Sequence, residues 1–586
     1  MTLTHEENPV GSRTRDELAA ENIGAIPEDI ANHEDASIES EEEKGTFDER
    51  SKGLVVVIML ALSLAVFLSA LDTTIITVAL PTISEHFHSS AGYTWIGSAY
   101  LLANAASTPL WGKLSDIFGR KPMLLVANLA FLIGSLIAGL SINIGMLIVA
   151  RAIQGIGGGG LLTLVDIVIS DMFSLRTRGA YLGVIGGVWA IACAIGPIIG
   201  GAFTGKVSWR WCFYINLPLD GLAFFIILFF LDVKTPRTPI VEGLLAIDWL
   251  GTLAVVGATL IFLFGLQYGG LTYPWGSATV ICLLIFGILL FVVFFIIEWK
   301  FAKYPVMPLR IFKYRSNCGV LLAVFLHGFV FIAEFYFLPL YFQAVRGSSP
   351  LLSGVYILPS ALGTGLAAIA TGAFIGATGQ YLPPIYTGFT LMLLGYGLLI
   401  DLDANSGWAK LIIFQIIVGV GVGPNFQAPL VALQTHIRPG DIATGTATFN
   451  FVRNIGSSMS VIIGQVVFQN QMAKKQPQLI AALGPATAAR LDGANAGANT
   501  QVIDALPPAQ KTVARAAFAD SLRPMWIMYT CFAVVALLSV LLIQRTQLTS
   551  KHQELEVGLE AEKKNEAARK AEKEAKDIEK GRESHH

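Results

Sequence analysis

The stretch GKLSDIFGRK at residues 112–121 is a short polar segment between two long apolar runs, 93–111 and 122–142. An apolar run of about 20 residues can cross a lipid bilayer as a helix, because a helix bonds its backbone groups within its own segment. The stretch therefore predicts a tight connection between two membrane-spanning helices. The same pattern of apolar runs and short polar connections continues on both sides of it.

The composition of the whole chain agrees with this prediction. Of the 586 residues, 54% are hydrophobic and only 14% are charged, and the mean hydropathy is +0.61. Soluble domains carry about a quarter charged residues, so lipid is the expected solvent here. The net charge of −2 gives no reason to expect a nucleic-acid partner.

The apolar runs predict an all-α integral membrane fold with fourteen transmembrane helices. These predicted spans lie at about 54–80, 93–111, 122–142, 145–170, 179–203, 212–232, 247–268, 276–297, 318–344, 350–375, 381–401, 408–433, 445–469 and 524–544. Lysine and arginine are more frequent in the short connections that would face the cytoplasm if residue 1 is cytoplasmic, which predicts that orientation.

A weak internal repeat suggests how the helices are grouped. Gly112 and Gly119 of the segment 112–121 recur with the same spacing as Gly372 and Gly379 in the segment 372–381, which has no charged residues. This makes the tenth span the counterpart of the second, and predicts two six-helix pseudo-symmetric bundles with an inserted helix pair. The predicted parts are an acidic disordered cytoplasmic tail (1–50), the first bundle (51–232), the inserted pair with its linkers (233–317), the second bundle (318–545, with an extracellular loop at 470–523 that carries one or two surface helices) and a charged cytoplasmic tail (546–586).

The loop 112–121 has the chemistry of a conformational switch. Gly112 and Gly119 permit close backbone approach. Asp116 can cap a helix or pair with Arg120, and Lys121 adds another charge. Such a cluster could hold two helices together in one state and release them in another. The alternative is a basic loop that only sets the topology.

This loop resembles the signature loop of the major facilitator superfamily, and four further segments agree. RAIQGIG at 151–157 resembles the superfamily's buried-arginine motif. LDTTIITVALP at 71–81 and WRWCFYINLP at 209–218 are similar to the fourteen-spanner drug:proton antiporter family, especially its fungal branch. The antiporter motif of exporters is matched at Gly183, Gly196, Pro197, Gly200 and Gly201. Ala192 and Thr77 depart from the usual pattern. The resemblance covers about 54–545.

The resemblance implies a proton-coupled secondary transporter that exports drugs, toxins or secondary metabolites by alternating access. Its partners would be a small-molecule substrate, protons and the bilayer, and it would act as a monomer in the plasma membrane. One alternative is a plasma-membrane or vacuolar transporter of basic amino acids. A membrane enzyme or receptor is a remote third, since the spans contain no HExxH motif and no nucleophile elbow.

No cofactor or metal site is expected. The sequence has no phosphate-binding GxxxxGK[ST] motif. The glycine run at 155–160 fits a dinucleotide fingerprint by its letters, but it lies within an apolar helix with no preceding strand. Close packing between helices explains these glycines better.

Ionisable residues inside predicted spans are candidate functional groups, because a charge in the bilayer is costly. Asp72 is a candidate site for a proton or a cationic substrate, unless Thr73, Thr74 or a neighbouring helix satisfies it. The resemblance implies that Arg151 couples proton movement to conformational change, with Gln154 one turn later on the same face. The alternative is a structural arginine capped by carbonyl groups.

Glu334 lies in the middle of the ninth span, the expected counterpart of the first. It could therefore face the same central cavity as Asp72, with the aromatic residues Phe335, Tyr336 and Tyr341 as walls for flat or cationic compounds. Alternatively, Glu334 is paired within its bundle and the aromatic rings face lipid. Further candidates for the cavity or its charges are Arg453, Asn425, Gln427 and Asn450. Asp166 and Asp171 are expected to pair in a loop with Arg176 and Arg178.

Overall fold

The computed structural model describes residues 52–549, except 232, 234, 235, 237, 271 and 498, and residues 558–567, except 562 and 565. The predicted tail 1–50 and most of the tail 546–586 lie outside the described residues. Within the described part the chain is built from helices, apart from an isolated bridge between Gly269 and Tyr273. The predicted all-α class is confirmed.

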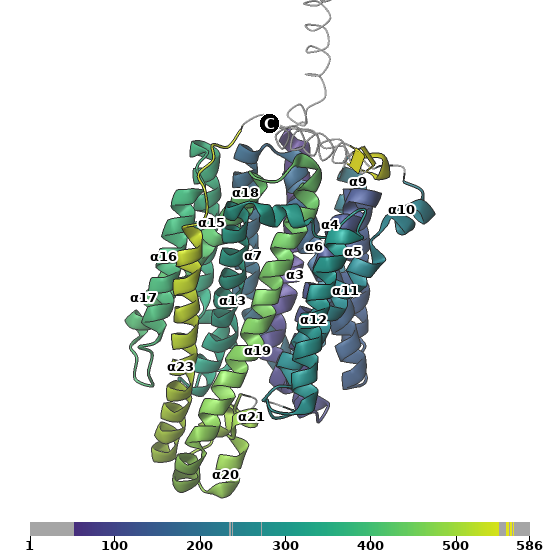
Figure 1. Cartoon of the computed structure of the whole chain (residues 1–586). Coiled ribbons are helices and arrows are strands. Elements are labelled where there is room, and N and C mark those ends of the chain that lie inside the picture. The colour runs from purple at the N-terminus through teal and green to yellow at the C-terminus, as the bar shows by residue number, and fades with distance from the viewer. Residues whose placement is uncertain are drawn as a thin grey trace, which may run out of the picture. The chain divides into compact units, whose positions relative to one another are not determined.

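The helices from α3 to α9 form the first group, here called the N-bundle (Figure 1). Its members are α3 (Lys52–His86), α4 (Ser90–Phe118), α5 (Arg120–Gly139), α6 (Ile144–Met172), α7 (Leu175–Lys206), α8 (Trp211–Tyr214) and α9 (Asn216–Phe230). The second group is called the C-bundle. Its members are α13 (Arg315–Ala344), α14 (Pro350–Val355), α15 (Leu358–Thr378), α16 (Leu382–Leu399), α17 (Trp408–Val422), η4 (Gly423–Asn425), α18 (Ala428–Gln434), η5 (Pro439–Asp441), α19 (Ile442–Leu483) and α23 (Pro508–Val540).

The two bundles repeat the same packing pattern. In the N-bundle, α3 packs on α7 and α9, while α6 packs on α4 and α5. In the C-bundle, α13 packs in the same way on α19 and α23, while α17 packs on α15 and α16. Between the bundles, α4 lies against α19 and α7 lies against α15, which is the exchange that a pseudo-two-fold axis produces. Helix α13 is therefore the counterpart of α3.

An extra helix pair covers one seam between the bundles. After the short helix α10 (Ile240–Ala246), α11 (Trp249–Tyr268) packs on both α4 and α19. Leu263 of α11 is buried together with Leu102 and Ile462, one residue from each bundle. Its partner α12 (Ala278–Lys300) packs on α11 and exposes large apolar side chains such as Phe286, as a lipid-facing helix should. The 3₁₀ helix η3 (Leu309–Lys313) then leads into the C-bundle.

Thirteen helices in the described part are long and apolar enough to cross a membrane. The predicted second span forms α4, which is 29 residues long but is not among these thirteen. Its polar residues, such as Asn104 and Lys113, lower its hydropathy and are buried against other helices. The predicted number of fourteen spans is thus not confirmed on these criteria, although α4 occupies its expected place in the N-bundle.

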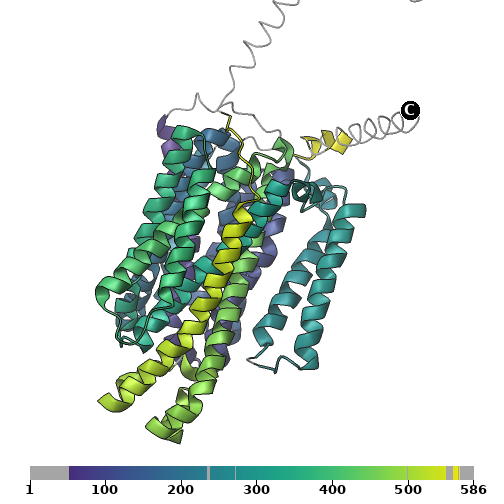
Figure 2. The same cartoon turned by 60° about the vertical axis from the view of Figure 1, so that its left-hand side comes forward.

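The segment 470–523 is mainly helical: the predicted loop with one or two surface helices is shorter than its prolines indicated, because both flanking helices extend into it. Helix α19 continues to Leu483 with Pro477 inside it, and α23 already begins at Pro508. Between them lie α20 (Pro485–Arg490), α21 (Gly493–Ala496) and α22 (Gln501–Asp504). The alanine-rich sequence explains the difference, because alanine has the highest helix propensity. Figure 1 and Figure 2 show the ends of α19 and α23 extending past the other helices.

Candidate functional site

A buried ion pair joins α3 and α6 inside the N-bundle. The guanidinium of Arg151 donates to the carboxylate of Asp72, and the two side chains are only 1% exposed. Arg151 also donates from Nε to the carbonyl oxygen of Ile96 at 3.1 Å, and from Nη1 to Oε1 of Gln154 at 2.9 Å. The sequence predicted a role for both charges but did not predict that they pair.

Two amide side chains complete the site around Asp72. Gln154 and Asn216 each donate from their amide nitrogen to Oδ1 of Asp72 at 3.1 Å, and each also contacts Oγ of Ser135, at 2.8 and 3.3 Å. Thr73 and Thr74 instead donate to main-chain carbonyl groups of their own helix. The alternative in which these threonines satisfy Asp72 is wrong. The carboxylate is held by two neighbouring helices, α6 and α9, and Asn216 of α9 is a site residue that the sequence analysis did not identify.

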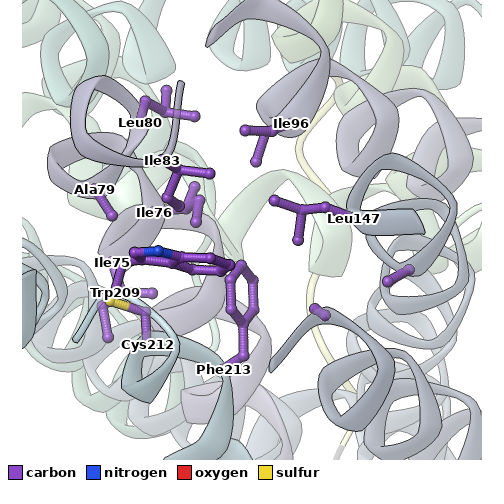
Figure 3. Close-up of a cluster of buried hydrophobic side chains, with 12 residues drawn as sticks. Ile75, Ile76, Ala79, Leu80, Ile83, Ile96, Leu147, Trp209, Cys212 and Phe213 are labelled. Carbon is purple, nitrogen blue, oxygen red and sulfur yellow. The ribbon is translucent and has the colours of Figure 1, made fainter. Parts of the chain in front are cut away.

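An apolar cluster closes one end of this site. It contains Ile75 and Ile76 of α3, which follow Asp72 by about one turn, together with Trp209 and Phe213. Figure 3 shows the rings of Trp209 and Phe213 side by side next to these isoleucines. The guanidinium carbon of Arg151 lies 5.9 Å from the centre of the Phe213 ring. Because water is kept away, the attraction between the two charges is weakly screened.

A cavity of about 70 Å³ lies between the two bundles. Its lining residues are Val66, Thr73, Tyr100, Leu101, Asn104, Leu162, Asp166, Ile185, Gly186, Trp189, Phe331, Ile332, Phe426, Gln427, Arg453, Asn454, Ser457 and Ser458. Tyr100 connects this cavity to the ion pair, because its ring centre lies 4.5 Å from the guanidinium carbon of Arg151. Asp72 and Arg151 thus lie directly behind the cavity wall.

Three aromatic rings form one wall of the cavity. Trp189 of α7 lies 4.9 Å from Phe426 and 5.5 Å from Phe331, measured between ring centres, and Phe331 lies 5.0 Å from Phe426. The predicted aromatic residues lie elsewhere. Tyr341 donates to the carbonyl oxygen of Asp403, whereas Phe335 packs behind Trp189 without lining the cavity.

Two further aromatic and amide candidates have other surroundings. The hydroxyl of Tyr336 points toward Gly97 of α4, across the interface between the bundles. Asn425 donates to the carbonyl oxygen of Gly421 at 3.0 Å and does not line the cavity, whereas Gln427 does. Of the predicted amides, Gln427 therefore contributes directly to the cavity wall.

Neither Glu334 nor Asp72 lines this cavity, so the predicted shared cavity is not seen in the described structure. Glu334 is buried, and neither carboxylate oxygen has a hydrogen-bond partner among the described residues. Phe331 and Ile332 of the same helix line the cavity, whereas Glu334 does not. Within its bundle, the hydroxyl of Ser360 on α15 lies near enough to act on Glu334, although the two groups do not have hydrogen-bond geometry.

The charges that do face the cavity are Asp166 and Arg453, one from each bundle. Asn450 bridges them: its amide nitrogen donates to Asp166 at 3.0 Å and its oxygen accepts from Arg453 at 2.5 Å. Arg453 and Asn450 were predicted as cavity residues. Asp166 was wrongly expected in a loop, although its position inside the predicted span 145–170 could have identified it as an intramembrane acid.

The connection from α4 to α5 is the single residue Gly119, and the predicted pair of Asp116 and Arg120 spans it. Arg120 lies 2.6 Å from Asp116 and 2.7 Å from Asp171, which follows at the end of α6. Gly119 has a φ of 95°, a backbone conformation that favours glycine, and Lys121 is partly exposed in the first turn of α5. The predicted bond between Asp116 and Arg120 is confirmed, and Asp171 pairs with Arg120 rather than with Arg176.

Two arginines at the start of α7 join the bundles at the same end. Arg178 donates to Oε1 of Gln434 at 2.7 Å, and Gln434 in turn donates to Oγ of Ser170 at 2.9 Å. Arg176 donates to the carbonyl oxygens of Gly376 and Ala377 at 3.0 and 2.6 Å. These contacts close the end of the interface at which the polar loop 112–121 lies.

Comparison with known proteins assigns the fold to a family. The model of the Major Facilitator Superfamily matches residues 62–461. The chain belongs to this superfamily. It is similar to the efflux pump dotC of Dothistroma septosporum (66% identity, 93% of each chain) and to the MFS-type transporter ppz2 of Metarhizium majus (53% identity, 91% of this chain and 92% of that one).

Among solved structures, the proton:xylose symporter XylE has a TM-score of 0.54 at 14% identity, covering 84% of this chain and 97% of that one. At this identity the likeness supports the fold alone. The protein is accordingly a multi-pass membrane protein of the superfamily, with the repeated helical bundles that its packing pattern shows.

The antiporter-motif glycines of this superfamily member lie at helix contacts. A Cβ at Gly196 would lie 2.2 Å from Oγ1 of Thr74, and one at Gly200 would lie 2.4 Å from the carbonyl oxygen of Ile75, so both positions seat α7 against α3. Next to them, Pro197 of α7 packs against Gly354 of α14 in the C-bundle.

Gly183 and Gly201 of the antiporter motif and Gly112 of the segment 112–121 lie between the bundles. A Cβ at Gly183 would lie 2.8 Å from Cα of Gly372, and one at Gly201 would lie 3.0 Å from Cα of Leu351. At Gly112 it would lie 2.6 Å from Cβ of Ala447. These glycines allow the bundles to approach more closely than larger side chains would permit.

Proposed function

We propose that the protein is a proton-coupled secondary transporter that exports small molecules by alternating access. The observation that carries this proposal is the buried ion pair of Asp72 and Arg151, which lies behind the wall of a cavity between two pseudo-symmetric bundles. Intramembrane charges are retained where they serve transport or proton movement. Relatives that are named efflux pumps support export as the direction.

The proposed coupling is a competition for Asp72. A proton on its carboxyl group removes the negative charge that holds Arg151, so protonation and the ion pair exclude each other. Tyr100 lines the cavity and lies against Arg151, which gives a bound molecule a direct contact through which to disturb the pair. A proton and a bound substrate would in this way both act on the ion pair of Asp72 and Arg151.

The proposed cargo is an amphipathic compound with a flat apolar part. The rings of Trp189, Phe331 and Phe426 supply an apolar wall, whereas Asn454 and Ser457 supply polar groups in the same cavity. Because the enclosed volume is only about 70 Å³, the bundles must separate at one end to admit a larger molecule. The contacts of Arg176 and Arg178, which join the two bundles, would open in the state that faces the cytoplasm. We place the transporter, as a monomer, in the plasma membrane.

The test uses the full-length protein in liposomes with an imposed pH gradient and a fluorescent planar dye. Asp72→Asn should fold but lose most of the gradient-driven dye transport. The matched control is Asp401→Asn, which removes a carboxylate paired with Lys410 near the end of α16, where the Asp401 side chain is 75% exposed. This control should transport like the unaltered protein.

Full gradient-driven transport by Asp72→Asn would contradict the proposed coupling. Labelled lysine serves as the second cargo in the same vesicles. Gradient-driven movement of lysine without movement of the dye would instead favour transport of basic amino acids.

A further inference from the structure

A second buried acid of the N-bundle is not used by the proposed mechanism. Asp220 lies in α9 with a relative exposure of 0%, and neither of its carboxylate oxygens has a hydrogen-bond partner among the described residues. Burying an ionised carboxylate without a partner is far more costly than burying the neutral acid. The site therefore favours a carboxyl group that carries a proton.

Helix α9 connects this acid to the ion pair. Asp220 follows Asn216 by four residues, so both side chains lie on the same face and are separated by about 6 Å along the helix axis. Asn216 donates to Oδ1 of Asp72 at 3.1 Å. Asp220 is thus one turn away from a residue that holds the proposed coupling carboxylate.

Polar side chains of the neighbouring helix α5 continue the series formed by Asp72, Asn216 and Asp220. Tyr214 donates to the carbonyl oxygen of Gly139 at 2.9 Å, and Asn216 contacts Ser135 at 3.3 Å, so α5 and the segment from Tyr214 through α9 run antiparallel. In this register Asp220 is level with the turn of α5 that precedes Ser135. Asn128 follows in the same direction, buried and with neither amide atom bonded in the described structure. This series of polar side chains leads from Asp72 toward the N-terminal end of α5, at Arg120.

The charges around Asp220 can be stated for each helix that packs on α9. These helices are α3, α5 and α8. Away from the helix ends, their ionisable side chains are Asp72, Cys212 and Tyr214. The hydroxyl of Tyr214 is bonded to Gly139, and Asp72 is balanced by Arg151. Asp220 is therefore the carboxyl group in this region whose charge no neighbouring cation balances within the described structure.

We propose that Asp220 is the inner proton site of the transporter, which receives the proton that Asp72 gives up. In this step the proton leaves the carboxyl group of Asp72 and joins the carboxylate of Asp220, while Arg151 takes the place of the proton at Asp72. Charge is conserved, and the product is the arrangement seen here: an ion pair at Asp72 and an unpaired buried acid at Asp220. The inference rests on the proposed function.

The experiment compares Asp220→Asn with Asp72→Asn and with the control Asp401→Asn in the dye-loaded liposomes. Two activities are measured: dye transport driven by a pH gradient, and dye exchange without a gradient, which needs no net proton movement. Asp220→Asn should lose gradient-driven transport and keep exchange. Asp220→Glu, which restores a carboxyl group, should recover part of the gradient-driven activity.

The possible outcomes separate the two proposals. If Asp220→Asn keeps full gradient-driven transport while Asp72→Asn loses it, the inner proton site is wrong and the proposed function stands. If both variants keep it, proton coupling through this region is wrong altogether. Loss of exchange together with gradient-driven transport in Asp220→Asn, without rescue by Asp220→Glu, would also overturn the inference, because it indicates a structural role.

A measurement on the unaltered protein covers the case in which Asp220→Asn does not fold. Dicyclohexylcarbodiimide modifies protonated carboxyl groups in apolar surroundings, and mass spectrometry can locate the product within residues 216–230. We expect modification at Asp220 that decreases as the pH is raised. A protein that is modified elsewhere but never at Asp220 would contradict the proposal.

Discussion

Helices α3 and α13 hold equivalent places in the two bundles, and each buries one acid, but the surroundings of the two acids differ. Asp72 accepts hydrogen bonds from Arg151, Gln154 and Asn216. Glu334 has no hydrogen-bond partner among the described residues and does not line the cavity. The repeat has thus preserved the helix packing while its charge chemistry diverged. The ion pair belongs to the N-bundle, whereas Phe331 and Phe426 of the aromatic wall belong to the C-bundle.

The two repeated loops differ in the same way. In the loop 112–121, Arg120 is held by the carboxylates of Asp116 and Asp171. In the loop 372–381, glycine occupies the position of Asp116, and Arg176 instead donates to main-chain carbonyl oxygens. One loop is closed by charge pairs and the other by neutral acceptors, so the two should respond differently to substitution.

The largest effect is expected from Arg151→Ala. Removal of one partner from a buried ion pair leaves an uncompensated charge, which costs about 3–5 kcal/mol. We expect loss of transport and a clearly lower unfolding temperature in detergent. The matched variant Arg151→Lys keeps a positive charge and should lose less stability. If Arg151→Ala unfolds at the temperature of the unaltered protein, the ion pair does not stabilise the N-bundle.

A large loss of transport is also expected when a bulky side chain keeps the two bundles from approaching each other closely. At Gly112 a Cβ alone would lie 2.6 Å from Ala447, so Gly112→Leu should hold α4 away from α19 and reduce transport with little change in expression. The control is Gly205→Leu in α7, because a Cβ there would meet no atom within 4 Å. Equal transport by the two variants would show that close approach at Gly112 is not needed.

A small effect on stability is expected from Glu334→Gln. This acid has no hydrogen bond to lose in the described structure, so the substitution should change the unfolding free energy by less than about 1 kcal/mol. Asp72→Asn should destabilise the protein more, because it removes the charge that balances Arg151. Thermal unfolding of both variants gives the comparison directly. A larger loss for Glu334→Gln would mean that the two acids are not as different as their surroundings suggest.

The smallest effect is expected from restoring a charge to the second loop. Gly376→Asp places a carboxylate near the partly exposed Arg176, and a Cβ at this position meets only ordinary contacts. An ion pair near the surface contributes less than about 1 kcal/mol. We expect a slight rise in unfolding temperature that disappears at high salt. A gain that persists at high salt would point to a cause other than charge.

Much of the architecture could be predicted from the sequence because lipid imposes a strong rule on it: apolar runs of sufficient length must form spanning helices. The sequence predictions that failed also have local causes. The prolines of 470–523 predicted a loop, but alanine-rich flanks carry α19 through Pro477 to Leu483. Likewise, Asp166 lay inside a predicted span and was assigned to a loop because arginines follow it in the sequence.

The sequence by itself determined the membrane-embedded helical fold, the pair of Asp116 with Arg120 and the intramembrane positions of Asp72, Arg151 and Glu334. These follow from hydropathy and from spacing within one helical turn. Only the tertiary structure decided which charges meet. Asp72 and Arg151 are far apart in the chain, and whether Glu334 or Asp166 faces the cavity depends on how each helix is rotated in its bundle. That rotation is set by packing against several helices at once, and no single segment of the sequence encodes it.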